Sequence, residues 1–243
     1  MKTQVNQDYP IRLTYLQVCT RVEKFLKRKQ KKIIKIMSEG QVVIAIDAMG
    51  GENSPFKVLK GTEIFLQKER NTKIIFFGNE KLILENIKKN NLNIFNFDVV
   101  NTEDIISDED NVNTILRSKK NSSIYKGLDF AKKNVNSGFV SSGSTAAIMV
   151  LSRLHMGMIE GIDRPAICSL VPNRKNYSLM LDLGANVLVS GSNLFQFALM
   201  GFCYYSIINK NTKPKIGILN IGTENNKGLE FLQEASDLIL SSF

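Results

Sequence analysis

The chain has 243 residues, of which 43% are hydrophobic and 23% are charged, so it can bury a substantial core and remain polar outside. Its net charge of +9 is concentrated at one end, because residues 1–36 hold ten Lys and Arg against only Asp8 and Glu23. The rest of the chain is nearly neutral and has no Trp, which argues against a nucleic-acid-binding protein.

The cysteines and the apolar runs indicate a cytoplasmic protein. The three cysteines are far apart and have no C-x-x-C partner, which argues against disulfides or a zinc site. The longest apolar run, residues 194–208, is shorter than the roughly 20 residues of a membrane span and predicts a buried helix. No apolar stretch follows the N-terminal charges, as it would in a secretory signal.

Residues 1–40 form a basic N-terminal extension that differs in composition from the rest of the chain. Basic clusters in residues 21–35 alternate with apolar residues at helical spacing, which is typical of a helix lying on an anionic membrane surface. Two other interpretations stay open: a solvated, partly disordered arm, and a start codon assigned too early, with Met37 as the true first residue.

From residue 42 onward, β-rich runs alternate with helical stretches. This alternation predicts an α/β fold in which a mainly parallel sheet has helices on both faces. Residues 166–171 and 177–183 are too close for a helical crossover, so we expect these two strands to be antiparallel. The expected strands are 42–47, 73–77, 94–100, 138–141, 166–171, 177–183 and 215–221, and the expected helices are 55–68, 80–90, 122–136, 145–153, 192–209 and 227–241.

Three segments at predicted strand ends or helix starts carry polar and small residues where an α/β sheet binds its ligands. The first, residues 46–55, has a carboxylate, two glycines and a proline, and an ordinary strand-to-helix turn explains it equally well. In the second segment, three cations precede two hydroxyls: Arg117, Lys119, Lys120, Ser122 and Ser123. This arrangement suits phosphate binding, but it also suits a solvated loop with a helix cap.

The third segment, residues 140–147, is made of small residues that include Ser141, Gly143 and Thr145. Small side chains let main-chain amides contact a phosphate or a developing oxyanion, although close packing of a helix on a strand requires the same residues.

Two further strand ends carry Asp182 with Asn186, and Asn220 with Lys227. These side chains either hold loops in place or face a substrate.

Several common activities have no support in the sequence. The phosphate-binding motif G-x-x-x-x-G-K-[ST] and the dinucleotide motif G-x-G-x-x-G are both missing. His155 is the single histidine and no G-x-S-x-G motif is present, which argues against a Ser-His-Asp hydrolase. We interpret His155 as structural, and Cys168, inside an apolar strand, as an inert buried thiol.

Seven motifs in this order resemble the PlsX family of phosphate acyltransferases from residue 42 to about residue 241: IDAMGGENSP, LRSKKNSSI, FVSSGSTAAIM, GIDRPAI, LDLGANV, FALMG and GILNIGTENNKG. The resemblance implies a three-layer α/β/α sandwich, similar to isocitrate dehydrogenase and phosphotransacetylase, formed by residues 41–243 and incomplete at its C-terminus. It also implies transfer of an acyl group from acyl-acyl-carrier-protein to inorganic phosphate for phospholipid synthesis.

The resemblance further implies a cytoplasmic homodimer with peripheral membrane contact, no metal or organic cofactor, and a downstream glycerol-3-phosphate acyltransferase. Lys120, Asp182 and Asn186 would then be catalytic. The remaining candidates would bind phosphate or substrate: Arg117, Lys119, Ser122, Ser123, Ser141, Gly143, Thr145, Asn220 and Lys227.

The chain departs from the family pattern at Ser144 and Ala146, where Asn and Gly are usual, and at Leu188, where a polar residue is usual. Family members also continue past the position of Phe243, so we expect low or no turnover from this chain alone. The alternatives are a phosphate acyltransferase that uses acyl-coenzyme A and an inactive fragment of the enzyme.

Overall fold

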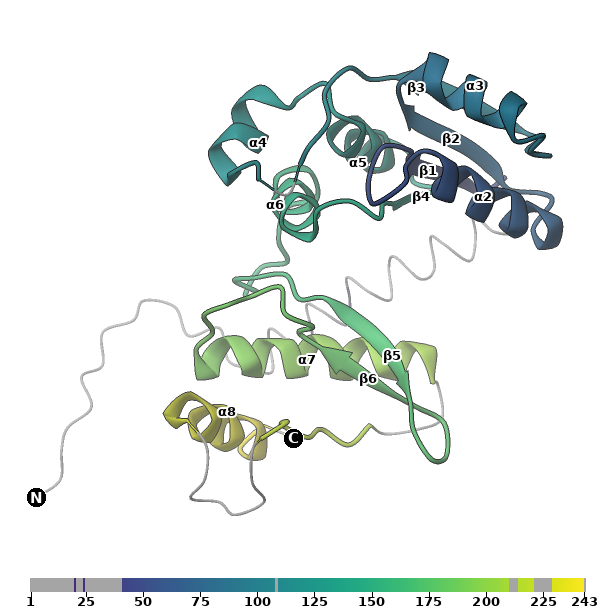
Figure 1. The fold of residues 1–243 in the computed structure, drawn as a ribbon. Coiled ribbons are helices and arrows are strands. Elements are labelled where there is room, and N and C mark those ends of the chain that lie inside the picture. Colours follow the sequence, from purple (N-terminus) through teal and green to yellow (C-terminus); the bar gives the residue numbers. More distant parts are fainter. Residues whose placement is uncertain are drawn as a thin grey trace, which may run out of the picture. The chain divides into compact units, whose positions relative to one another are not determined.

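The computed structural model describes residues 20, 24, 41–107, 109–209, 214–220 and 229–242 (Figure 1). The described residues from 41 to 157 form one compact unit, the N-terminal unit, and those from 158 to 242 form a second, the C-terminal unit. Apart from Thr20 and Lys24, the predicted basic extension lies outside the described residues. Its three interpretations, and the assignment of residues 41–243 to one incomplete acyltransferase domain, stay predictions.

A four-stranded parallel sheet organises the N-terminal unit. Its strands lie in the order β3-β2-β1-β4. They are β1 (Val43–Asp47), β2 (Lys73–Gly78), β3 (Phe97–Asn101) and β4 (Ser137–Val140). The helices of this unit are α2 (Phe56–Lys68), α3 (Glu80–Lys89), α4 (Val112–Ser118), α5 (Ser123–Lys133) and α6 (Thr145–Met156).

Helices cover both faces of the two central strands, β1 and β2, which explains why the interiors of these strands are apolar. On one face Ile46, Ile74 and Phe76 pack in a single core with Leu59 of α2 and Ile83 of α3. On the other face Ala45, Ile75 and Phe77 form a core with the half-buried Phe130 of α5. The predicted three-layer α/β/α arrangement with a parallel sheet is confirmed (Figure 1).

The order of the strands creates a switch point between β1 and β4. From β1 the chain proceeds through α2, β2 and α3 to β3 on one side, and then returns to place β4 on the other side of β1. In open α/β sheets, ligands bind beyond the carboxyl ends of strands at such a point, because the flanking loops diverge there. The loops after Asp47 and Val140 meet this condition.

The C-terminal unit contains a hairpin and two helices. The strands β5 (Cys168–Pro172) and β6 (Tyr177–Leu181) pair antiparallel, as the short connection predicted. The hairpin packs on α7 (Gly191–Ile208), where Leu181 lies against Gly201, and α7 also packs on α8 (Glu230–Leu240). Among the described helices, none combines the length and the apolar character needed to cross a membrane.

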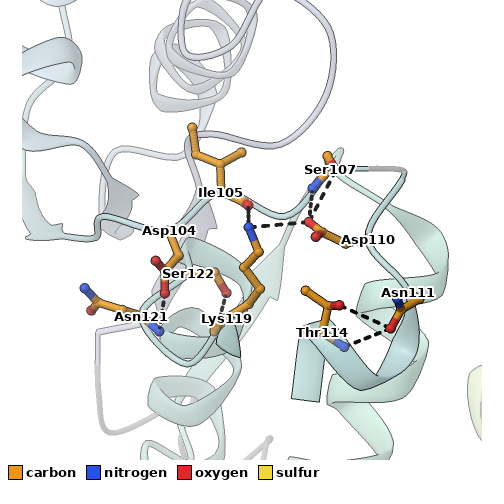
Figure 2. A network of polar contacts seen from close by, with 9 residues as sticks. All are labelled: Asp104, Ile105, Ser107, Asp110, Asn111, Thr114, Lys119, Asn121 and Ser122. Carbon is orange, nitrogen blue, oxygen red and sulfur yellow. Dashed lines mark hydrogen bonds and ion pairs between the residues drawn. The ribbon is translucent and has the colours of Figure 1, made fainter. Parts of the chain in front are cut away.

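Two expectations about local structure were wrong, and one helix was not predicted. Within the described residues 214–220 there is no strand, since no neighbouring strand pairs with them and Leu219 is 82% exposed. Cys168 is exposed, because the whole of β5 is uncovered within its unit. The seven-residue α4 was not predicted, because its periodic stretch is too short, and it starts where the Asn111 side chain accepts a hydrogen bond from the Thr114 N–H (Figure 2).

Candidate functional site

A buried carboxylate joins the two loops at the switch point. Asp47 ends β1 and its side chain is fully buried. Its Oδ1 accepts hydrogen bonds from the N–H groups of Met49 (3.0 Å) and Gly50 (3.1 Å), and its Oδ2 accepts one from Ser141 Oγ (2.6 Å). Asp47 therefore satisfies three donors at once and ties the loop after β1 to the loop after β4. We call Asp47, Gly50, Ser141, Ser142 and Gly143 the strand-end cradle.

The two loops of the cradle approach too closely for side chains at its glycines. A Cβ atom on Gly50 would lie 2.6 Å from the Gly143 nitrogen and 2.8 Å from the Gly143 Cα. Ser142 Oγ donates to the Gly50 carbonyl (2.9 Å), and Ser141 Oγ accepts from the Gly143 N–H (3.0 Å). The small residues of both motifs are thus explained by backbone contact between the loops, which gives the cradle one defined shape.

The helix that leaves the cradle, α6, has an open N-terminus. Its N-cap residue, Ser144, makes no side-chain hydrogen bond to the helix, and Thr145 and Ala146 are exposed. The first amides of a helix have no partner within it and carry the positive end of the helix dipole. The start of α6 therefore presents unpaired N–H donors beside the cradle, in an arrangement suited to an anion.

The N-terminus of α5, by contrast, is closed by its own serine. Ser122 is fully buried, and its Oγ accepts from the Tyr125 N–H (3.3 Å) and donates to the Lys119 carbonyl (2.7 Å). Ser123 is also buried. Both hydroxyls lie inside the protein, and that of Ser122 is engaged in the cap and the preceding turn. Figure 2 shows its contact with Lys119.

The cations of this segment differ in their surroundings. Lys119 Nζ donates to the Ile105 carbonyl (2.8 Å) and lies 3.6 Å from Asp110 Oδ2 (Figure 2). A hydrogen bond from the Ser107 N–H, and then the charge of Lys119, lower the pKa of Asp110. Arg117 and Lys120 are exposed, and within the described part of the chain neither side chain has a hydrogen bond or an ion pair. These two cations are therefore available to an anionic ligand.

The candidates in the C-terminal unit form a self-contained loop. Asp182 Oδ2 accepts from both the backbone N–H and the side-chain amide of Asn186 (3.1 Å each), and Asn186 also donates to the Pro165 carbonyl (2.9 Å). Asn220 lies in the described stretch 214–220, whereas Lys227 lies outside the described residues. The structure thus groups Asp182 with Asn186, and separately groups Ser141, Gly143 and Thr145 at the cradle.

Asp47 and Gly50 were not among the predicted site residues, although their motif was noted. A charged residue at the end of an otherwise apolar strand is the signal that could have identified Asp47, because a buried carboxylate needs several donors. Among the described residues, no three or more His, Cys, Asp or Glu side chains lie close enough together to hold a metal ion.

His155 lies outside this site, on α6, and is buried with its ring edge against Tyr125 (centroids 4.5 Å apart). Burial lowers the pKa of His155, and the negative charge of Asp129 only partly opposes this effect.

Comparison with known proteins points to one group. The profile of a family described as "Fatty acid synthesis protein" matches residues 42–243. The chain is 36% identical over 199 residues to a phosphate acyltransferase of Caldicellulosiruptor bescii and 37% identical over 199 residues to one of Clostridium tetani, covering 82% of this chain and 60% of each relative. A phosphate acyltransferase of Pelagibacter ubique is 36% identical, with 79% of this chain and 57% of the relative covered. The chain thus spans about three fifths of the length of these relatives.

Proposed function

The chain belongs to the fatty acid synthesis protein family, and from this membership we propose that it is a phosphate acyltransferase acting on acyl-acyl-carrier-protein and inorganic phosphate. The names of its relatives support acyl transfer to phosphate. The single observation in this chain that carries the proposal is the open N-terminus of α6 beside the strand-end cradle.

The proposed reaction needs groups that bind negative charge. A phosphate oxygen attacks the thioester carbonyl carbon, the carbonyl oxygen becomes an oxyanion, and the carbon–sulfur bond then breaks. The products are an acyl phosphate and the carrier thiolate, which takes up a proton. Amides at the start of α6 would bind the phosphate or the oxyanion, which stabilises the transition state more than the ground state. Arg117 and Lys120 would add positive charge that attracts phosphate.

The other predicted residues keep their proposed roles on the strength of the family resemblance. Asp182 and Asn186 would be catalytic, together with Lys120. The others would bind phosphate or substrate: Lys119, Ser122, Ser123, Asn220 and Lys227. The same resemblance supports a cytoplasmic homodimer with peripheral membrane contact, whose product passes to a glycerol-3-phosphate acyltransferase in phospholipid synthesis.

Acyl-phosphate formation by the full chain tests the proposal. Hexadecanoyl-acyl-carrier-protein and phosphate are incubated with the purified chain, and acyl phosphate is trapped with hydroxylamine as the hydroxamate. Because we expect low turnover from this chain, the proposal predicts slow formation of a product that requires phosphate, enzyme and the carrier protein. If product forms from hexadecanoyl-coenzyme A but not from the carrier-protein thioester, the acyl donor is acyl-coenzyme A. No product from either donor, with a chain that unfolds cooperatively, would contradict catalysis by this chain and favour the inactive fragment.

The amide of Thr145 can be removed with little change to the helix. Thr145→Pro eliminates this N–H at the first helical position, where proline is well tolerated, and Ser144 already has the extended ψ of 120° that a following proline requires. Thr145→Ala keeps the amide and removes only the side chain. We expect kcat/KM of Thr145→Pro to be about 10- to 100-fold below that of Thr145→Ala. Equal values for the two variants would show that this amide does not contribute.

Lys120 is expected to contribute to phosphate binding. Lys120→Ala should raise the KM for phosphate several-fold, and the effect should shrink at high salt, because the interaction is between charges at the protein surface. Lys132→Ala, which removes one exposed charge near the other end of α5, is the matched control. An equal change in KM for both variants would indicate a general effect of net charge.

A further inference from the structure

An apolar groove opens directly from the strand-end cradle. Its cavity has a volume of about 360 Å³, which is in the usual range for small-molecule sites. Its apolar wall comes from α2, β1, β2 and β4, and consists of Ile44, Ile46, Val58, Phe65, Ile74 and Val140. Asp47, Ser141 and Ser142 of the cradle also line it. Lys57 and Thr62 of α2 complete the lining. The polar residues that the groove takes from the strand ends are therefore those of the candidate site.

Among the described residues of the N-terminal unit, no helix covers β4 on this face of the sheet, and this leaves the groove open. The parallel register pairs Ile44 with Gly138 and Ile46 with Val140, so these residues share a face. Helix α2 packs on Ile46 but does not extend over β4, and Val140 is 54% exposed. Apolar side chains at the floor of a cavity next to polar strand ends suit a ligand that has a polar head and an apolar tail.

One residue that lines the groove, Gly61, is a glycine without any structural need for glycine within the unit. Gly61 lies in the interior of α2, where glycine destabilises a helix relative to alanine, and a Cβ there would meet no atom within 4 Å. Gly50 and Gly143 differ, because contact between the loops explains them. Gly61 lines the groove, so its missing side chain leaves room for a ligand.

We propose that this groove binds the acyl chain of the thioester substrate, with Gly61 leaving room for a long chain; this inference rests on the proposed function. If the thioester carbonyl binds at the start of α6, it lies beside the cradle, and the acyl chain can then extend into the groove. Each methylene group that enters the groove raises the affinity roughly fourfold. We propose the acyl chain and not a protein segment as the occupant, because a segment in this groove would contact Asp47, Ser141 and Ser142 and would compete with the substrate.

Gly61→Phe places an aromatic ring in the groove and tests the proposal. The full chain is titrated with the fluorescent fatty acid cis-parinaric acid, and octanoate and hexadecanoate are used to displace it. In the acyl-phosphate assay, kcat/KM is measured with octanoyl, dodecanoyl and hexadecanoyl thioesters of the carrier protein. We expect about a tenfold loss of hexadecanoate affinity or more, little change for octanoate, and a shift of kcat/KM toward short chains.

Ile64→Phe is the matched control, because it adds the same ring to α2 at a position that is 50% exposed and does not line the groove. It should leave the chain-length preference unchanged. Val140→Phe adds a ring where the groove adjoins the cradle and should weaken the binding of both octanoate and hexadecanoate. This second variant guards against the case in which Gly61→Phe fails to fold.

The inference is overturned if the wild-type chain binds no fatty acid, or if folded Gly61→Phe and Val140→Phe retain wild-type affinity for hexadecanoate. The binding experiment needs no turnover. An inactive chain that binds hexadecanoate in a Gly61-dependent manner would therefore contradict the proposed function while supporting the groove.

Discussion

Asp47→Ala is expected to abolish acyl-phosphate formation and to lower the free energy of unfolding by about 3–5 kcal/mol. The substitution removes the acceptor shared by the Met49 and Gly50 amides and the Ser141 hydroxyl, at a position that is fully buried. Each buried donor left without a partner costs about 1–3 kcal/mol, and water entering the cavity would recover part of this. Denaturant unfolding, followed by circular dichroism, measures the loss.

Asp47→Asn is the informative companion to this variant. Its remaining carbonyl oxygen can still accept from the Met49 and Gly50 amides, while the charge and the second acceptor oxygen are lost. We expect a stability between those of the wild type and Asp47→Ala. If the free energy of unfolding of Asp47→Ala is within about 1 kcal/mol of the wild-type value, Asp47 does not hold the two loops together as described.

Gly50→Ala should lower kcat/KM by about a hundredfold or more and destabilise the fold by about 2–3 kcal/mol. The added methyl group would lie 2.6 Å from the Gly143 nitrogen and would also overlap Asp47 Oδ2. Backbone atoms cannot move aside as a flexible side chain can, so the loop after β4 must shift, and the start of α6 shifts with it. The measurements are the hydroxamate assay and denaturant unfolding.

Gly61→Ala is the control for this prediction, because it adds the same methyl group where there is space for it. The quantity measured is its free energy of unfolding. Its Cβ meets no atom within 4 Å, so the gain in helix propensity should raise stability by about 0.5–1 kcal/mol. Wild-type stability and activity in Gly50→Ala would contradict the close approach of the two loops.

The sheet could be predicted from the sequence because its signals are local. Apolar strands such as residues 73–77 are bounded by helices whose apolar residues recur at helical spacing, and short connections fix the order of elements. The expected strand at 215–221 had the correct composition, but a strand also needs a neighbour, which composition does not reveal. Likewise, Cys168 lies in an apolar run, yet its burial depends on what covers the hairpin.

The candidate site was predicted only in part, because its central contact is not local. Asp47 and Ser141 are 94 positions apart, and only the pairing of β1 with β4 brings them together. Ser122 and Ser144 also look alike in sequence, because each is a serine at the start of a predicted helix. In the structure the Ser122 side chain caps its helix, whereas that of Ser144 does not. This difference depends on side-chain geometry. Because of it, the N-terminus of α6, and not that of α5, has amides free to bind an anion.

The most direct test of the anion site is a phosphate titration followed by amide chemical shifts of the isotopically labelled full chain. We predict saturable shifts that are largest for the amides of residues 144–147 and the adjoining cradle, and that are much weaker in Thr145→Pro. Shifts confined to residues 117–123 would move the site to α5. No saturable shift at either helix N-terminus would contradict phosphate binding by this chain.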